Sequence, residues 1–332
     1  MLRTLVLGIV QGLTEFLPIS SSAHLSIIPK LLGYKTPELA FDVLLHFGTL
    51  TAVVVYFARD LWSFVLSLVA PGVLGPRQAA ARRRQLGLLV VASIPAAVFG
   101  FLLQNWADQQ TSRPLRSAVW LVLTTLLMIG AELWARSHPP AVAVTAGPAS
   151  PARDAGAFEE PPRPTPAQVQ LAATAARPMT RAEIRRQIRG QHPAATAAPT
   201  GATEELERLP LAKAVGIGLA QAVALIPGTS RSGATISAGL FERVSREAAA
   251  RFSFLLSIPA ILGAGVLKLD DLSRAAEPPA QLAVGFVAAA VSGFLAVSFL
   301  IRLLRTRTLW PFIWYRLIAG ALFVVLLATV RG

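Results

Sequence analysis

The sequence has 332 residues, of which 54% are hydrophobic and 15% are charged, and its formal net charge at pH 7 is +13. Soluble domains carry about 25% charged residues, so this composition argues against a soluble enzyme, a disordered protein and a coiled coil, and it favours a polytopic membrane protein. The basic excess then predicts positively charged cytoplasmic loops rather than a nucleic-acid-binding surface, and the absence of cysteine from the sequence excludes disulfides and thiolate ligands.

The first part of the chain, residues 1–136, opens with an apolar stretch that is not an ordinary membrane span. This stretch, Leu5–Ile28, contains several polar or helix-breaking residues: Gln11, Glu15, Pro18, Ser20, Ser21, Ser22 and His24. A span needs about 20 mostly apolar residues, and three later stretches meet that condition: Leu39–Phe57, Leu86–Leu103 and Ser117–Ala135. Leu61–Leu74 is too short to span and is expected at the membrane interface.

Residues 137–209 differ in composition from the rest of the chain. They hold 11 of its 24 prolines, together with many alanines, threonines and arginines. Such a segment cannot bury enough apolar surface to offset its ordering entropy. We therefore expect a mostly disordered loop.

The last part, residues 210–332, resembles the first. Leu211–Leu240 is an apolar stretch interrupted by Gln221 and by the polar run Pro227–Ser232. Three further spans are predicted, at Phe252–Leu269, Gln281–Ile301 and Phe312–Val330.

Short similar sequences occur in both parts. In each interrupted stretch a glutamine precedes a proline, and hydroxyl residues follow that proline. The tetrapeptide Ser-Ile-Pro-Ala also occurs twice, at 93–96 and at 257–260. Weak internal repeats joined by a long loop are typical of duplicated membrane folds.

Arginine positions predict the orientation of the chain. The loops at 71–85 and 302–310 each carry at least three arginines and no acidic residue, so both are expected in the cytoplasm. When the chain is traced through the six predicted spans from these two cytoplasmic loops, the 137–209 loop falls in the cytoplasm and both termini fall outside. Leu211–Leu240 then begins and ends on the cytoplasmic side and must be re-entrant, and by repeat symmetry Leu5–Ile28 enters from the outside.

The predicted fold class is therefore an all-α polytopic integral membrane protein with two inverted repeats, each made of a re-entrant helical hairpin plus transmembrane helices. The hairpin tips carry the polar residues. Non-helical backbone at that depth is tolerated only when it is buried in protein or lines a wet cavity. The two tips are expected to meet near the membrane interior, with the mouth of the site facing outside.

The tip of the second hairpin, residues 227–235, has the composition of an oxyanion-binding loop. Glycine permits close backbone approach, and a helix N-terminus attracts anions. Arg231 adds a permanent charge with the fork geometry that phosphate oxygens favour, and a charge between long apolar flanks is usually functional. The candidate substrate-binding residues around it are Gly228, Thr229, Ser230, Ser232 and Thr235.

The tip of the first hairpin supplies groups for acid–base or nucleophilic chemistry. Glu15 can be a general base, a nucleophile or a metal ligand, and His24 can exchange a proton near neutral pH. Ser20 and Ser21 can attack phosphorus or bind phosphate, and Gln11 shares a helix face with Glu15. Each residue alone is a weak signal, but together, opposite an arginine-bearing loop, they predict a hydrolytic site.

Two sequence signatures resemble those of the undecaprenyl-diphosphate phosphatases, also called bacitracin-resistance proteins. The stretch from Gln11 to His24 is similar to the first signature, in which Glu or Gln is followed, after three residues, by Glu. The stretch Pro227–Thr235 is similar to the second, Pro-Gly-X-Ser-Arg-Ser-X-X-Thr. The resemblance covers residues 1–136 and 210–332, and the loop between them is longer than in most relatives.

The resemblance implies a hydrolase of the bacterial inner membrane that converts undecaprenyl diphosphate to undecaprenyl phosphate and inorganic phosphate. This reaction regenerates the lipid carrier for peptidoglycan and other envelope glycans, and it removes the lipid that bacitracin sequesters. The resemblance also implies a divalent cation, Mg²⁺ or Ca²⁺, with Glu15 as the candidate ligand. Gln11 stands where some relatives have glutamate, which weakens any scheme that needs two carboxylates.

Two questions stay open at this level. The catalytic candidates Glu15, Ser21, His24 and Arg231 fit either direct attack by water or a covalent phospho-intermediate. Inverted repeats with broken helices also suit a transporter or flippase of a phosphorylated lipid, although a transporter needs no base or nucleophile. The expected partners are the bilayer and a polyprenyl diphosphate, nucleic acid is not expected, and a homodimer is left open.

Overall fold

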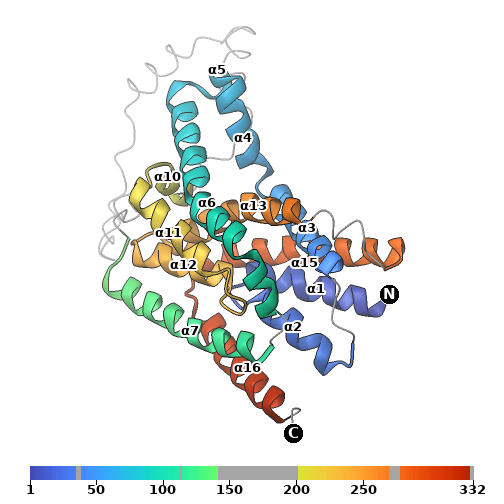
Figure 1. Ribbon diagram of the computed structural model, residues 1–332. Helices are drawn as coiled ribbons and strands as arrows, with labels where there is room; N and C mark the ends of the chain where they lie inside the picture. The colour runs from blue at the N-terminus through green and yellow to red at the C-terminus, as the bar shows by residue number, and fades with distance from the viewer. Residues whose placement is uncertain (35–38, 112–113, 141–200, 269–276, 330–332) are drawn as a thin grey trace, which may run out of the picture. The chain divides into compact units, whose positions relative to one another are not determined.

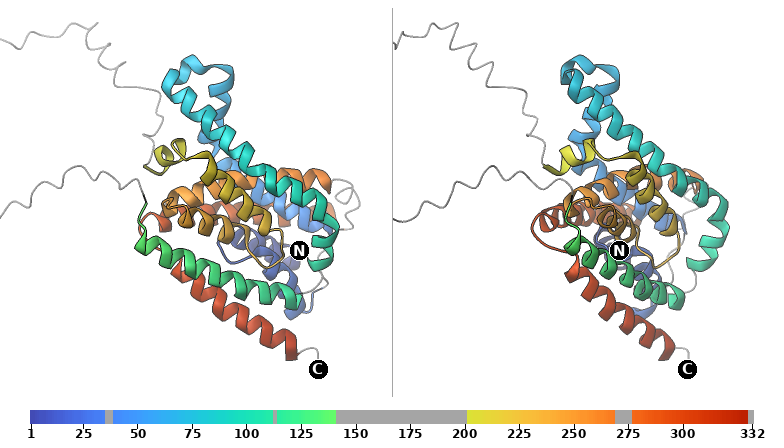
Figure 2. Two further views of the ribbon diagram at one scale, coloured as in Figure 1. Left: turned by 60° about the vertical axis from the view of Figure 1, so that its left-hand side comes forward. Right: turned by 90° about the vertical axis from the view of Figure 1, so that its left-hand side faces the viewer.

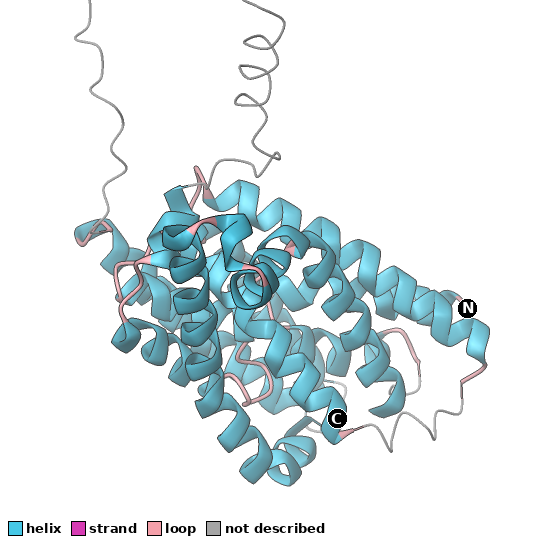
Figure 3. Ribbon diagram, turned by 90° about the horizontal axis from the view of Figure 1, so that it is seen from above, coloured by secondary structure: helices cyan, strands magenta, loops and turns pink. Residues whose placement is uncertain are grey.

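The computed structural model describes residues 1–34, 39–111, 114–140, 201–268 and 277–329 (Figure 1). Every regular element in these ranges is an α-helix (Figure 3), which confirms the predicted fold class. The helices before the long loop are α1 (Leu2–Phe16), α2 (Ser21–Leu31), α3 (Leu39–Tyr56), α4 (Ala58–Val69), α5 (Pro71–Leu74), α6 (Pro76–Thr111) and α7 (Pro114–Ser137). Those after it are α10 (Gly201–Glu207), α11 (Leu211–Val223), α12 (Arg231–Phe241), α13 (Arg246–Leu267), α15 (Pro279–Leu304) and α16 (Trp310–Thr329).

Helix length and composition fit a multi-pass membrane protein. Among the described residues, five helices are long and apolar enough to cross a bilayer, namely α7, α13, α15, α16 and the part of α6 from Pro76 to Leu103. A sixth crossing results if α3 and α4 count as one span with a bend of 71° between them. The stretch Leu61–Leu74 forms most of α4 and all of α5; α4 follows α3 after a single residue and packs against α6. The expected position of this stretch at the membrane interface stays a prediction.

Each predicted re-entrant stretch folds as two helices that contact each other, α1 with α2 and α11 with α12. The second helix of each pair begins after a serine in the left-handed region, Ser20 with φ 75° and Ser230 with φ 72°. This conformation is unfavourable for residues other than glycine, so tertiary contacts must hold both breaks. Pro18 and Pro227 lie just before the breaks and lack the N–H that a continuous helix would need.

The two hairpins use the same packing contact at equivalent positions. Gly8 of α1 faces α15, where an added Cβ would lie 2.5 Å from the carbonyl oxygen of Gly285. Gly218 of α11 faces α6, where an added Cβ would lie 2.2 Å from the carbonyl oxygen of Ala92. Gly8 and Gly218 are as far apart along the chain as the two break serines. The hairpins are therefore repeated units, and Figure 1 shows α1 beside α15.

The two copies of Ser-Ile-Pro-Ala do not occupy equivalent helices of the two repeats. Residues 93–96 lie in α6, whereas 257–260 lie in α13. Since α13 directly follows its hairpin and α3 takes that place in the first part, the two tetrapeptides mark different helices. Proline is tolerated inside membrane helices, so such a motif recurs in unrelated spans.

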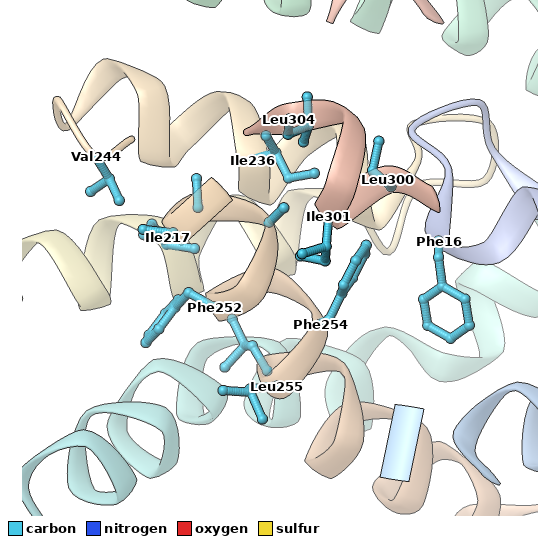
Figure 4. Close-up of a cluster of buried hydrophobic side chains, with 14 of the residues drawn as sticks. Phe16, Ile217, Ile236, Val244, Phe252, Phe254, Leu255, Leu300, Ile301 and Leu304 are labelled. Carbon is cyan, nitrogen blue, oxygen red and sulfur yellow. The ribbon is translucent and has the colours of Figure 1, made fainter. Parts of the chain in front are cut away.

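One apolar cluster joins the first hairpin to the spans (Figure 4). Phe16, the last residue of α1, is 1% exposed, and its ring meets that of Phe254 in α13 edge-on, with ring centroids 5.4 Å apart. Because Glu15 directly precedes Phe16, this anchor also fixes the position of Glu15. Other members of the cluster in Figure 4 are Ile236 of α12, Leu255 of α13, and Leu300 and Ile301 of α15.

The expected disordered loop, residues 137–209, is too long at its C-terminal end. Helix α10 lies within it, and the side chains of Leu206 and Leu209 are 1% and 3% exposed in the core cluster. Arg84 of α6 donates hydrogen bonds to the carbonyl oxygens of Glu207 and Leu209. Tertiary contacts thus stabilise a helix too short to be stable alone. Residues 141–200 lie outside the described residues.

Ion pairs connect the segments predicted to be cytoplasmic. Asp60 of α4 lies 3.4 Å from Arg82 of α6 and 2.9 Å from Arg251 of α13. The fully buried Glu132 of α7 accepts two hydrogen bonds from Arg246 of α13, at 3.0 and 2.6 Å. These ion pairs bring the segments that the arginine positions predict to be cytoplasmic into contact, and their side of the membrane stays a prediction.

Candidate active site

The two hairpin tips contact each other, as the inverted-repeat prediction requires. The backbone N–H of Gly228 donates to Ser22 Oγ at 3.0 Å, and Ser232 Oγ donates to the carbonyl oxygen of Leu17 at 3.2 Å. Each tip therefore uses a serine just inside its second helix to bond the backbone of the other tip. The polar residues of both signatures come together at this junction.

Glu15 is the centre of the junction. Its carboxylate accepts from Arg231 Nη2 at 2.5 Å through Oε1, and from Ser21 Oγ at 2.5 Å and Gln11 Nε2 at 3.2 Å through Oε2. Glu15 is only 8% exposed, and hydrogen bonds to a buried charge are short and strong. Glu15, Ser21, Gln11 and Arg231, all predicted from sequence, thus form one connected group.

Arg231 lies in the second tip and bonds Glu15 in the first. It is the first residue of α12, and besides Glu15 it donates to the carbonyl oxygen of Ser257 at 3.4 Å. A guanidinium has five N–H donors, so the two contacts in the described structure leave donors for phosphate oxygens. The side chain is 17% exposed, and the α12 N-terminus beside it adds a favourable field for an anion.

The other candidates of the second tip mainly hold its shape. Ser230 Oγ caps α12 by accepting from Gly233 N–H at 3.2 Å, and Thr235 Oγ1 lies 2.5 Å from Ser253 Oγ. Gly228 has φ 97°, and a Cβ there would lie 2.2 Å from a backbone oxygen of α7, so glycine is required. Thr229 is 1% exposed, and its hydroxyl has no hydrogen-bond partner among the described residues. Their predicted roles in substrate binding stay predictions.

His24 makes its hydrogen bonds to Ser20 and Tyr315 and none to Glu15. Its Nδ1 is 2.7 Å from the carbonyl oxygen of Ser20 and must donate, because a carbonyl only accepts. Its Nε2 lies 2.7 Å from Tyr315 Oη, the two rings stack, and the histidine is 2% exposed. Ser21 donates to Glu15 instead, so the Ser21–His24 pair considered from sequence is not formed here.

Arg316 of α16 is a residue that the sequence reasoning missed. It is fully buried and donates to the carbonyl oxygens of Pro18 and Thr229, one in each tip, at 3.3 Å in both cases. It also donates to Thr124 and Thr125 of α7, which lies beside α16 in both views of Figure 2. The signal was a charged residue inside a predicted span, which is rare without a function.

Asp42 and His46 of α3 were missed for the same reason, since they lie inside the predicted span Leu39–Phe57. His46 Nε2 lies 3.8 Å from Glu15 Oε2, and His46 Nδ1 lies 3.9 Å from Asp42 Oδ1. The two side chains are one helical turn apart, so they share a face of α3. The structure therefore adds a second ionisable group beside Glu15.

The residues around Glu15 do not fit a preformed cation site. A guanidinium already neutralises the carboxylate that would bind the ion, and Gln11 supplies an amide where a second carboxylate is absent. Within the part of the chain that the structure describes, no group of three or more His, Cys, Asp or Glu residues could hold a metal ion. The Mg²⁺ or Ca²⁺ expected from the resemblance stays a prediction, without an assigned ligand.

Comparison with known proteins agrees with this arrangement. The family model of the bacitracin resistance protein BacA matches residues 4–150 and 172–322. The undecaprenyl-diphosphatase of Alcanivorax borkumensis is 41% identical over 98% of both chains. That of Geobacter sulfurreducens is 37% identical over 95% of this chain and 94% of its own, and that of Chlorobium phaeovibrioides is 36% identical over 98% and 97%. The chain belongs to the bacitracin resistance protein BacA family.

Proposed function

We propose that the protein hydrolyses undecaprenyl diphosphate to undecaprenyl phosphate and inorganic phosphate. The observation that carries the proposal is the group formed by Ser21, Glu15 and Arg231, which joins a hydroxyl, a base and a phosphate-binding cation at one junction. The reaction recycles the lipid carrier of peptidoglycan and other envelope glycans. It confers bacitracin resistance because it removes the lipid that bacitracin sequesters.

The geometry supports Ser21 as the nucleophile and Glu15 as its base. Ser21 Oγ attacks the terminal phosphorus and gives its proton to Glu15 Oε2, which lies 2.5 Å away. The bond from that phosphorus to the bridging oxygen breaks, and its electron pair leaves with undecaprenyl phosphate. Water then attacks the phosphoserine and the Oγ–P bond breaks. Glu15 returns a proton to Ser21 Oγ, and inorganic phosphate is released.

Arg231 stabilises the charge that develops on the phosphoryl oxygens. Its donors and the N-terminus of α12 face the same junction, and such groups act most strongly where water is excluded. Gln11 orients the Glu15 carboxylate through its 3.2 Å hydrogen bond. Gly228 lets the backbone of the second tip approach closely, and the Thr229 hydroxyl, which has no partner in the described structure, is available to a phosphate oxygen.

Phosphate release in detergent tests the proposal and separates it from transport. Purified protein without vesicles has no compartments, so a transporter or flippase would release no phosphate from a polyprenyl diphosphate. We expect release by the wild type and none above background from Ser21→Ala. Quenching the wild-type reaction in acid should trap phosphate on Ser21, and its recovery on another residue would reject Ser21 as nucleophile.

We further propose that the protein lies in the bacterial cytoplasmic membrane, with the mouth of the site facing outside. The ion pairs among the arginine-rich segments support a common side for them. Light scattering of the detergent-solubilised protein tests the homodimer. Because no residue is assigned as a ligand, the divalent-cation requirement is tested separately, by chelation with EDTA followed by addition of Mg²⁺ or Ca²⁺.

A further inference from the structure

His46 has the geometry of a base directed at Glu15. Its Nδ1 lies 2.8 Å from the carbonyl oxygen of Asp42 and must donate to it, because a carbonyl oxygen only accepts. In the neutral ring Nε2 therefore carries the lone pair, and Nε2 is the atom that lies 3.8 Å from Glu15 Oε2. Oε2 is also the oxygen that accepts from Ser21.

Exposure distinguishes His46 from His24. The side chains of His46 and Asp42 are 33% and 34% exposed, whereas His24 is 2% exposed with both ring nitrogens in hydrogen bonds. A carboxylate and an imidazole facing lipid would be costly, so this face of α3 must border water or a polar headgroup. His46 thus lies between the almost fully buried carboxylate of Glu15 and the exposed face of α3.

The surroundings favour a positive charge on His46 when it takes up a proton. Asp42 and Glu15 are negative, and the nearby positive charge is Arg231, which is paired with Glu15. The other helices packed on α3 are α13, α15 and α4. Within the described residues, their charged side chains lie near the helix ends: Arg59, Asp60, Arg246, Glu247, Arg251 and Arg302. Two carboxylates therefore dominate the field at His46.

The proposed chemistry gives such a group a role. Under the proposed function, Glu15 holds the Ser21 proton after the first half-reaction. It can act as a base toward water in the second half only after losing that proton. The imidazole, whose unperturbed pKa is about 6.5, gains and loses protons readily near neutral pH.

We propose that His46, oriented by Asp42, is the proton carrier of the site. Because 3.8 Å is longer than a hydrogen bond, the proton passes from Glu15 Oε2 through one water to His46 Nε2. An O–H bond of Glu15 breaks and an N–H bond of His46 forms, and the imidazolium then gives the proton to bulk water. Glu15 is thereby restored as a carboxylate and accepts the proton of the attacking water. The inference rests on the proposed function and adds a named residue to it.

The test compares full-length wild type, His46→Gln and Asp42→Asn in detergent, with His138→Gln as the matched control. His138 directly follows the last residue of α7, and its ring stacks on Trp134. At neutral pH, His46→Gln should lower kcat by about 10²-fold, change KM little, and lose the acidic limb of the pH profile that protonation of the imidazole produces. Phosphorylated Ser21 should also accumulate, because the second half-reaction becomes slow.

Two further measurements separate this role from a structural one. Asp42→Asn should move the acidic limb to lower pH, because the carboxylate that favours the charged imidazole is gone. His46→Ala should recover activity when imidazole is added, which a folding defect would not allow.

Several results would overturn the proposal. His46→Gln with the wild-type pH profile and kcat would show that His46 carries no proton. A change in KM alone would make it a binding residue, and a changed Mg²⁺ dependence without a changed pH profile would make it part of a cation site. An active wild type with any of these results overturns this inference alone. A wild type that releases no phosphate overturns the proposed function and the inference with it.

Discussion

Arg231 can be tested by a substitution that keeps its charge. Lysine retains the positive charge at the start of α12 but loses the fork of donors that binds two oxygens at once. We expect Arg231→Lys to lower kcat by about 10³-fold or more, as for other arginines that stabilise phosphoryl transfer. The measurement is phosphate release by detergent-purified protein, with elution volume as the check of folding.

Arg302→Lys is the matched control for that substitution. Arg302 is an exposed residue near the end of α15, and the same replacement there should leave turnover unchanged. If Arg231→Lys retained near-normal turnover, Arg231 would have to be removed from the phosphate-binding group, and its 2.5 Å contact with Glu15 would be structural only.

Arg316 should matter to stability more than to chemistry. It bonds one backbone carbonyl in each tip, Pro18 and Thr229, as well as α7. An ammonium group has three donors where the guanidinium has five, and each buried acceptor left unpaired costs about 1–3 kcal/mol. Arg316→Lys should therefore lower the melting temperature in detergent and lower kcat in parallel. Unchanged stability together with lost activity would instead place Arg316 in the catalytic group.

Individual site residues differ in how far the sequence could predict them. Glu15, Ser21 and Arg231 lie in breaks of apolar stretches, where local polarity is a clear signal, and the structure brings them together. His24 lies in the same break, but its ring turns toward Tyr315, a contact between distant parts of the chain. His46 lies inside a predicted span, so its nearness to Glu15 depends on how α3 packs on α1, which no local pattern reveals.

Helix α10 is an element that amino-acid composition alone does not predict. The spans are predictable because a bilayer crossing demands a long apolar run. Helix α10 has only seven residues and borders a proline-rich segment, so its sequence carries no such signal. It is ordered because Leu206 and Leu209 are buried and Arg84 bonds the carbonyl groups that follow the helix.

Two deletions distinguish the contribution of α10 to the fold from that of the rest of the expected loop. Replacing residues 144–199 with a short Gly/Ser linker should leave turnover and melting temperature unchanged, since that composition supplies no core. Extending the deletion to residue 209 should destabilise the protein, because each lost leucine contributes about 1.5–3 kcal/mol of burial. The comparison is made by thermal melting and phosphate release. Equal behaviour of the two deletions would show that α10 contributes nothing to the fold.

At the scale of the whole molecule, duplication explains why one site contains residues from both ends of the sequence. Each hairpin contributes a break serine, a serine that bonds the other tip and a glycine that packs on a span. The chemistry is divided unequally between these similar units. Glu15 and Ser21 come from the first tip and Arg231 from the second, so neither repeat alone holds the complete group.

The predicted orientation of the molecule follows from counting the spans. If α3 and α4 count as one bent span, the described residues contain six candidate crossings. Six is an even number and a re-entrant hairpin returns to its own side, so both termini are predicted to lie on one side. The arginine-rich segments are predicted to be cytoplasmic, which puts the termini and the mouth of the first hairpin outside. The same tracing of the chain predicts that the loop at 270–280 is external, and Glu277 in that loop lies 3.8 Å from Arg3 near the N-terminus.

Single cysteines test this orientation in intact cells, since the native sequence has none. Leu2 is 67% exposed at the N-terminus, and Ala80 is an exposed residue of α6 among the arginines. An impermeant thiol reagent should label Leu2→Cys and leave Ala80→Cys unlabelled until the membrane is permeabilised, because a charged reagent cannot cross the bilayer. Phosphate would then be released outside the cell. The reverse pattern, with Ala80→Cys labelled and Leu2→Cys protected, would invert the molecule and place the mouth of the site in the cytoplasm.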